Sequence, residues 1–149
     1  MLARLEVELP AHQALAPAFS SGALTTFEES QAEWEEDFND PAYATFVVEH
    51  DGAVVGSAVG CALAKSSSHT GPNLPDRAAF LGFAAVLPEA RGLGAGRALG
   101  EAVRGWAAAD GRFDAIATDW RETNLLSSRA WPALGYRSTF TRVHRLVDH

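Results

Sequence analysis

The twelve residues PEARGLGAGRAL, 88 to 99, constrain the fold of this 149-residue chain more than any other stretch. They contain three glycines at alternate positions, flanked by two arginines: Arg91, Gly92, Gly94, Gly96 and Arg97. A glycine inside a helix costs about 0.5–1 kcal/mol relative to alanine, so this spacing indicates that bare backbone is required. The run AAFLGFAAVLP before it is nearly all apolar, as in a strand buried on both faces, and residues 94–110 have a helical pattern. The stretch therefore predicts a turn between a buried strand and a helix.

Strands and helices alternate along the rest of the chain. Asp51-Gly52 between two β-rich arms predicts a hairpin over residues 44–64. Thr26 and Glu29 form a capping-box pattern at the start of an acidic helix. Its carboxylates are most simply a solvated face, and the alternative is an acidic rim that attracts a cationic substrate. The other expected elements are helices over 5–19 and 124–135, a polar loop over 65–77, and strands over 114–120 and 136–147.

Composition excludes several classes of protein. The net charge of −7 and the pI of about 5.1 argue against nucleic acid as a partner, which requires clustered lysine and arginine. The single cysteine, Cys61, rules out an internal disulfide framework. No apolar run reaches the roughly 18 residues of a membrane span, and the first residues lack a signal-peptide core. We expect a single domain over residues 1–149, cytoplasmic and without a membrane or nucleic-acid partner.

The predicted turn suits an anion, because the first turn of a helix has unpaired N–H groups and a partial positive charge. Glycines allow a phosphate to approach those groups closely. A P-loop needs Gly-Lys-Ser/Thr, whereas Arg97-Ala98 follows Gly96. A dinucleotide fingerprint needs a third glycine where Arg97 stands. The pattern that remains is Arg-x-x-Gly-x-Gly, at Arg91, Gly94 and Gly96.

This pattern resembles the pyrophosphate loop of the GCN5-related N-acetyltransferases, the GNAT family. Members carry an apolar strand and Pro-Glu before the loop, as FAAVLPEARGLGAGRAL does. About 30 residues later they carry an Asn, a small residue three positions on, an aromatic residue at seven, and Gly-aromatic at eleven and twelve. Those places are held by Asn124, Ser127, Trp131, Gly135 and Tyr136. The resemblance covers residues 44–140. It implies an α/β fold with a mixed, mostly antiparallel central sheet of about five to six strands, flanked by helices.

The resemblance also implies a binding site for acetyl-CoA as co-substrate, and no metal. Backbone groups of Ala84 and Val86 would pair with the pantetheine arm as an added β-strand. Asn124, with Ser127 beside it, would hold the same arm, a role compatible with that of a helix N-cap. Amides of the loop would hold the pyrophosphate: Arg91, Gly92, Gly94, Ala95, Gly96 and Arg97.

Direct transfer of acetyl from a thioester to an amine needs an oxyanion donor and a base. A strand-end amide near Val86 suits the first role. Asp119 and His69 are candidates for the base, although a strand-end aspartate is more often structural and a loop histidine more often solvated. Trp131 stands where the family commonly has a tyrosine that protonates the departing thiolate, and its indole N–H donates but does not titrate here. Ser128 or water is a further candidate for that proton.

We therefore expect an N-acetyltransferase that acts on a primary amine by direct transfer. The acceptor stays open: a small molecule, a peptide N-terminus and a lysine are all compatible with the sequence. The rival hypothesis from another class is a non-catalytic acyl-CoA-binding or sensing module, and a third is a nucleotide-binding Rossmann domain.

The sequence departs from the family pattern at the edges of the sheet. The first nine residues make a poor strand, and only one strand is expected after Gly135. The sheet would then have exposed edges, which need cover. Two explanations are open: a homodimer formed through the final strand, or descent from one half of a tandem protein.

Overall fold

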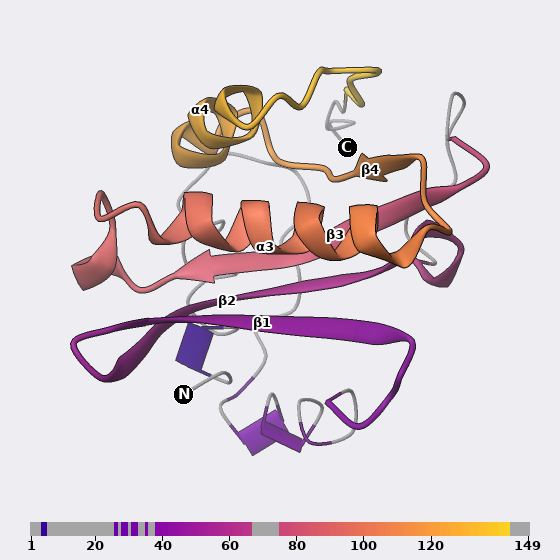
Figure 1. Cartoon of the computed structure of the whole chain (residues 1–149). Coiled ribbons are helices and arrows are strands. Elements are labelled where there is room, and N and C mark those ends of the chain that lie inside the picture. The colour runs from indigo at the N-terminus through magenta and orange to yellow at the C-terminus, as the bar shows by residue number, and fades with distance from the viewer. Residues whose placement is uncertain are drawn as a thin grey trace, which may run out of the picture.

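A computed structural model describes residues 4–5, 26, 28–29, 31–32, 35, 38–66 and 75–143 (Figure 1). Within these residues one sheet has the strand order β1-β2-β3-β4. The first three strands are antiparallel, and β4 runs parallel to β3. The strands are β1 Tyr43–His50, β2 Ala53–Ala62, β3 Ala78–Val86 and β4 Ala115–Ala117, the α-helices are α3 Ala95–Asp110 and α4 Leu125–Ala133, and the 3-10 helices are η1 Leu63–Lys65 and η2 Pro88–Ala90. The predicted mixed, mostly antiparallel α/β sheet flanked by helices is confirmed.

The predicted hairpin joins β1 to β2. Asp51 and Gly52 both have positive φ, 50° and 75°, which the two-residue turn between right-twisted strands requires. The pairing runs from Tyr43 opposite Cys61 to His50 opposite Ala53. The turn therefore sets the register that places small residues of β2 on the face under α3.

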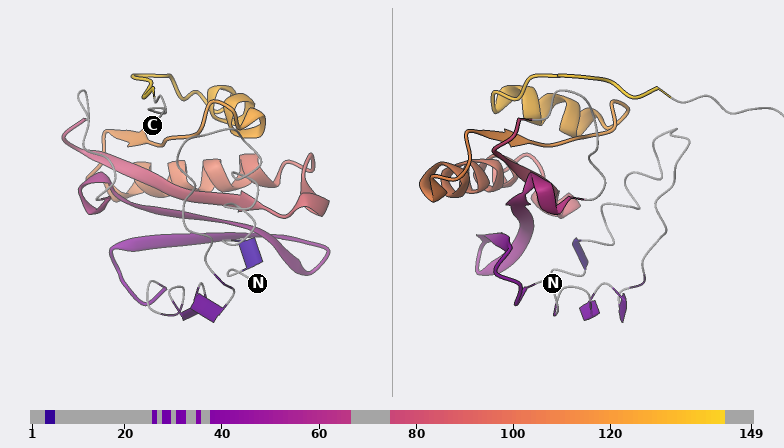
Figure 2. Two further views of the ribbon diagram at one scale, coloured as in Figure 1. Left: turned by 180° about the vertical axis from the view of Figure 1, so that it is seen from behind. Right: turned by 90° about the vertical axis from the view of Figure 1, so that its right-hand side faces the viewer.

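Helix α3 covers one face of the sheet, as the edge-on view of Figure 2 shows. Its Leu99 and Val103 are almost fully buried and pack against Ala58 of β2 and Leu81 of β3. Gly60 lies directly under the helix, since a Cβ there would come within 2.9 Å of the Trp106 ring. Small residues on the strand thus let the helix approach closely, which fixes where its first turn lies.

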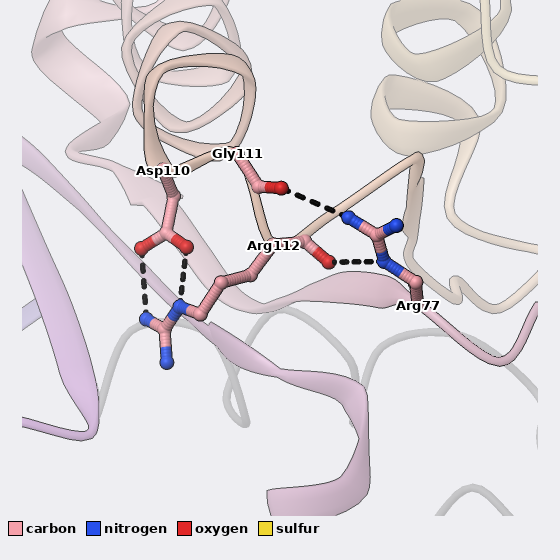
Figure 3. Close-up of polar contacts among 4 residues, drawn as sticks. All are labelled: Arg77, Asp110, Gly111 and Arg112. Carbon is pink, nitrogen blue, oxygen red and sulfur yellow. Dashed lines mark hydrogen bonds and ion pairs between the residues drawn. The ribbon is translucent and has the colours of Figure 1, made fainter.

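The C-terminal end of α3 is held by one arginine from the start of β3 (Figure 3). Arg77 donates from Nη2 to the carbonyl of Gly111 and from Nε to the carbonyl of Arg112, both at 2.9 Å. The amide of Asp114 donates to the carbonyl of Arg77 at 2.8 Å, and Arg112 pairs with Asp110. The Arg77 side chain therefore anchors the two residues that directly follow the helix to the start of β3.

Two strand predictions need correction. The strand expected over 114–120 is limited to Ala115–Ala117, and residues 136–143 form no strand. Residues 137–143 are all exposed, so no apolar face holds them against the sheet. The described residues thus contain four strands, where five to six were expected.

The N-terminal helices fall largely outside the described residues. In the second of them the predicted capping box is present: Glu29 accepts from the amide of Thr26 at 2.9 Å, and the Glu29 amide donates to the Thr26 hydroxyl at 3.3 Å. In the first of them Leu5 is buried and packs against Ala85 and Leu87 on the face opposite α3. Within the described ranges, no helix is long and apolar enough to cross a membrane.

Candidate functional site

Strands β3 and β4 separate at their carboxyl ends and form a fork. They pair only from Ala78 opposite Ala115 to Phe80 opposite Ala117, and β3 continues to Val86 without β4, paired with β2 alone. At the point of separation the Thr118 hydroxyl donates to the carbonyl of Leu81 at 3.0 Å. The two strands therefore separate directly after the hydrogen bond between Thr118 and Leu81.

A β-bulge lies at the same level of β3. Val59 of β2 stands opposite Phe83, and the next residue, Gly60, stands opposite Leu81, so that Gly82 is the extra residue. A bulge bends a strand and increases its local twist. The bulge therefore bends β3 at the level where it separates from β4.

The free end of β3 has backbone groups that point into the fork. The Leu87 amide donates to the carbonyl of Val55 at 2.9 Å, which makes these two residues a hydrogen-bonded pair. Since such pairs alternate along an antiparallel ladder, the N–H and C=O groups of Ala84 and Val86 point away from β2. These are the two residues that the sequence analysis assigned to pantetheine, and an extended ligand can pair with them there.

The glycine-rich stretch connects β3 to α3 through η2. Gly92 and Gly94 have φ values of 81° and 84°, in the left-handed region that side-chain-bearing residues rarely adopt. Gly94 is the N-cap of α3 and its carbonyl accepts the first helical bond, from Ala98 at 3.0 Å. The amides of Ala95, Gly96 and Arg97 therefore precede the first intrahelical donor, and no side chain caps them.

Gly96 needs a different explanation from Gly92 and Gly94. It lies inside α3, where a Cβ would meet only the Val86 side chain, at an ordinary 3.9 Å. The protein's own packing thus tolerates alanine at this position, yet the helix carries the less stable glycine. The packing of the described residues therefore does not require glycine at this position.

Near the loop, the carboxylate of Glu89 forms an ion pair. Arg4 contacts Glu89 of η2 at 3.0 Å. A backbone hydrogen bond, with Arg4 as a further cause, holds the pKa of the Glu89 carboxyl below its ordinary value. Arg91 and Arg97 are exposed on either side of the glycines. The rim of the loop is therefore basic apart from a carboxylate that already has a cationic neighbour.

Helix α4 presents the second motif. Asn124 is buried, and its side-chain oxygen accepts from the Ser127 amide at 3.3 Å, which makes it the N-cap of α4. The Ser128 hydroxyl donates to the carbonyl of Glu122 at 3.0 Å. Gly135 ends the helix with a φ of 90°. The predicted helix start and stop are confirmed, and the hydroxyl proton of Ser128 is engaged by the backbone carbonyl of Glu122.

Trp131 is part of the hydrophobic core. Its indole lies in the same cluster as Leu81 and Leu99, and packs edge-on against the Tyr136 ring with the centroids 5.7 Å apart. Burial raises the pKa of the Tyr136 phenol, with a smaller contribution from Glu101, and the buried Tyr136 hydroxyl has no hydrogen-bond partner. Packing alone accounts for the position of the Trp131 side chain.

The two candidate bases differ in what the structure says of them. Asp119 is exposed and follows Thr118 on the β4 arm of the fork, so it lies close to the opening. His69 lies outside the described residues. Among the residues that the structure does describe, no group of three or more histidine, cysteine or acidic side chains could hold a metal.

Thr118 and Gly82 were missed by the sequence analysis, although both shape the fork. A signal for Gly82 was present, because an isolated glycine in an apolar strand suggests a bulge. Nothing in the sequence distinguishes Thr118 from any other threonine at the end of a strand.

The fold is shared with known acetyltransferases. The aminoglycoside N-acetyltransferase AAC(6')-Iy, in complex with the bisubstrate analogue CoA-S-monomethyl-acetylneamine, gives a TM-score of 0.67 at 23% identity over 98% of this chain and 92% of that one. A mutant of the BH1408 protein from Bacillus halodurans gives 0.73 at 20% identity, over 98% and 91%. The aminoglycoside acetyltransferase meta-AAC0020 from an uncultured soil metagenomic sample, in complex with sisomicin, gives 0.65 at 15%, over 99% and 86%. At these identities the likeness shows the fold alone.

Sequence comparison gives the family. No curated protein sequence matches the chain. The model of the Acetyltransferase (GNAT) family matches residues 10–136, which is most of the chain and includes the glycine-rich loop, the fork and α4. The chain therefore belongs to the GNAT family of acetyltransferases.

Proposed function

We propose that this chain transfers the acetyl group of acetyl-CoA to a primary amine. The observation that carries the proposal is the combination of an open fork with an uncapped helix start beside it. Three amides at the start of α3 have neither a helical nor a side-chain acceptor, and Gly96 leaves them accessible. A helix N-terminus of this kind favours a phosphate group.

The rest of the cofactor would extend from the loop into the fork. The pyrophosphate would accept from the amides of the loop, with Arg91 and Arg97 adding charge. The amide of Arg91 itself donates to the carbonyl of Pro88 at a long 3.3 Å, so it would contribute less than the amides of α3. The pantetheine arm would lie along Ala84 and Val86. Its thioester would then reach the level where β3 and β4 separate.

The reaction would be direct attack of the amine nitrogen on the thioester carbonyl. The C–N bond forms, the C–S bond breaks, the base takes the proton lost by the amine, and CoA leaves as a thiolate. An amide at the free end of β3, near Val86, would stabilise the oxyanion. We assign the role of base to Asp119 rather than His69, because Asp119 lies on the β4 arm of the fork, exposed to solvent.

Trp131 and Ser128 are the least suited of the candidate proton donors. The indole is buried in the core, and the Ser128 hydroxyl donates to Glu122. A thiol has a pKa of about 8.5, taking cysteine as the model, so the thiolate is a tolerable leaving group without an acid. We propose that water protonates it. Asn124 would orient the pantetheine arm while it caps α4, with Ser127 beside it.

The acceptor would be a small amine. The solved relatives named for aminoglycosides favour a small molecule over a peptide or protein lysine. The alternative is a non-catalytic acyl-CoA-binding module, and the specific observation in its favour is Trp131 at the usual position of the tyrosine.

The test is thiol release from acetyl-CoA with a broad panel of amines, run beside calorimetric titration of acetyl-CoA. Turnover with at least one amine and micromolar binding of acetyl-CoA are expected. Binding without turnover for any acceptor, in the wild type and in Trp131→Tyr, would favour the sensing module. Absence of binding would refute both.

We also propose that the chain forms a homodimer. The described sheet ends in β1 on one side and in β4 on the other, and an exposed strand edge is an association site. Light scattering at micromolar concentration tests this proposal: a dimer is expected, and a monomer would contradict it.

A further inference from the structure

The hydrophobic core beside the fork comes nearest to the surface at Trp131. The buried members of the cluster that contains Leu81 are at most 2% exposed, except Trp131, which is 9% exposed. Leu81 stands where β3 and β4 separate, since its carbonyl accepts from the Thr118 hydroxyl. Trp131 belongs to α4, which lies above the N-terminal half of α3, on the side of the free end of β3 (Figure 1). The indole therefore packs against β3 at the level where the fork begins.

The acyl group of the cofactor would lie against this indole, so the inference rests on the proposed function. Ala84 and Val86, whose backbone groups face the fork, pack with their side chains against the same cluster as Trp131. A pantetheine arm along these two residues would end where β3 and β4 separate, and the acyl group attached there would lie next to Leu81 and Trp131. The walls that meet the acyl group would thus be large apolar side chains held in the core.

The indole has little room to move away from the fork. Behind it lies Gly100 of α3, where a Cβ would come within 2.6 Å of the Leu134 Cδ1 and 3.6 Å of the Trp131 Cζ3. The six-membered ring of the indole is therefore packed close to the backbone of α3. The Tyr136 ring packs edge-on against it from another side. A core packed in this way accepts extra methylene groups only with strain.

A cavity lies beyond the residues that surround the indole. Its volume is about 560 Å³, and its lining includes Gly100, Leu134 and Tyr136, which pack around Trp131. Thr118, at the start of the fork, lines it as well, whereas Trp131 is not part of the lining. The indole therefore stands between the fork and a space large enough for the end of a longer acyl chain.

We propose that Trp131 restricts the acyl donor to acetyl-CoA, because the indole leaves room for the methyl group of acetyl and for nothing longer. Propionyl and butyryl groups are longer by one and two methylene groups, which would have to displace the indole from the core. One methylene group too many in an apolar pocket changes kcat/KM by about 10–200-fold. This role depends on the size of the indole and not on its N–H group, so it suits a side chain that is packed as part of the core.

The test measures the affinities of free CoA, acetyl-CoA and butyryl-CoA by calorimetry. Wild-type protein should bind butyryl-CoA at least about tenfold more weakly than acetyl-CoA. Trp131→Phe removes the second ring and should reduce this ratio to about threefold or less. Free CoA has no acyl group, so its affinity should change less than the ratio does. Trp131→Tyr should reduce the ratio by a smaller factor, because the phenol oxygen occupies part of the space, and it serves if Trp131→Phe does not fold.

The matched control is Trp106→Phe. Trp106 packs against the same cluster, but it lies over Gly60 and against Phe113, in the C-terminal half of α3. The same substitution there removes a similar volume from the core at a distance from the start of the fork. Thermal stability should therefore fall, and the ratio of the two affinities should stay at the wild-type value.

The proposal would be overturned if wild-type protein bound butyryl-CoA as tightly as acetyl-CoA. An unchanged ratio in the folded Trp131 variants, or an equal change in Trp106→Phe, would overturn it as well. Failure of the proposed function gives different results. Protein that binds none of the three ligands would refute both proposals. The expected ratios without transfer to any amine would refute acetyl transfer alone and support selection of the acyl group by Trp131.

Discussion

The two ends of helix α3 are built in opposite ways. Just past its C-terminal end, Arg77 donates to the carbonyls of Gly111 and Arg112, the two residues that follow the helix (Figure 3). At its N-terminal end, Gly94 offers no side chain, and within the described part of the chain no side chain caps the first amides. Gly94 and Gly111 have similar backbone conformations, with φ values of 84° and 70°. A glycine in the left-handed conformation therefore stands at both ends of the helix. Only the one at the C-terminal end, Gly111, is bound by a side chain, that of Arg77.

This difference separates stability from binding. A helix end anchored by a side chain from elsewhere in the fold gains a contribution to the free energy of unfolding. A helix end without a capping side chain lacks that contribution, and its unpaired N–H groups can bind an anion. Substitutions at the two ends should therefore affect different measurements.

The largest effect is expected from Gly94→Val at the N-terminal end of α3, the end that we call open because no side chain caps it. A branched side chain at φ 84° is strained, and its methyl groups would occupy the space next to the amides of Ala95 and Gly96. We expect the affinity for acetyl-CoA, measured by calorimetry, to fall at least about 100-fold, or about 2.7 kcal/mol. Circular dichroism checks that the fold is retained. Unchanged affinity in a folded variant would contradict the assignment of the loop.

The second-largest effect is expected at the C-terminal end of α3. Arg77→Ala removes two hydrogen bonds from a charged donor to backbone carbonyls, and the exposure of the side chain reduces their worth. We expect the free energy of unfolding in urea to fall by about 1–2 kcal/mol. Affinity for acetyl-CoA should stay within twofold of the wild type. A large loss of affinity would mean that a substitution at the C-terminal end of α3 also impairs binding at its N-terminal end.

The sequence predicts those features of the structure that are determined by neighbouring residues, and it fails for those that depend on distant ones. Turn chemistry predicted the Asp51-Gly52 hairpin and the start of α3 at Gly94, because each depends on the conformation of one or two residues. The Asn124 cap was predicted for the same reason. The shortness of β4 and the missing strand over 136–143 were not predicted, since pairing depends on a distant partner that residue patterns do not specify.

The candidate site shows the same division. The loop residues could be named from their spacing, and so could Ala84 and Val86 through the family resemblance. The bulge at Gly82 and the Thr118 hydrogen bond to Leu81 were not found, because they arise from the register of β3 against its neighbours.

A moderate effect is expected at α4, whose N-terminus differs from that of α3 because a side chain caps it. Asn124→Ala removes the acceptor for the Ser127 amide and should destabilise the protein by about 1 kcal/mol. Asn124→Ser is the control, because serine can cap the helix but is too short to replace the amide group. If Asn124 also holds pantetheine, both variants lose affinity for acetyl-CoA, and only Asn124→Ala loses stability. Full affinity in Asn124→Ser would leave Asn124 as a cap alone.

The smallest effect is expected at Trp131. Its indole packs in the core, so Trp131→Phe should lower thermal stability while transfer falls less than about tenfold, or about 1.4 kcal/mol. Trp131→Tyr should keep or raise turnover. Abolished transfer in Trp131→Phe, with folding and acetyl-CoA binding intact, would show that the indole is required for the reaction.

The most direct test of the central claim, that the open end of α3 binds acetyl-CoA, compares Gly94→Ala with Gly111→Ala. In both glycines a Cβ would meet nothing within 4 Å, and both have positive φ, so alanine should cost each a similar stability, about 1–2 kcal/mol. Calorimetric titration should then show at least a tenfold loss of acetyl-CoA affinity for Gly94→Ala and a change within twofold for Gly111→Ala. Equal affinities in two equally destabilised variants would contradict the account.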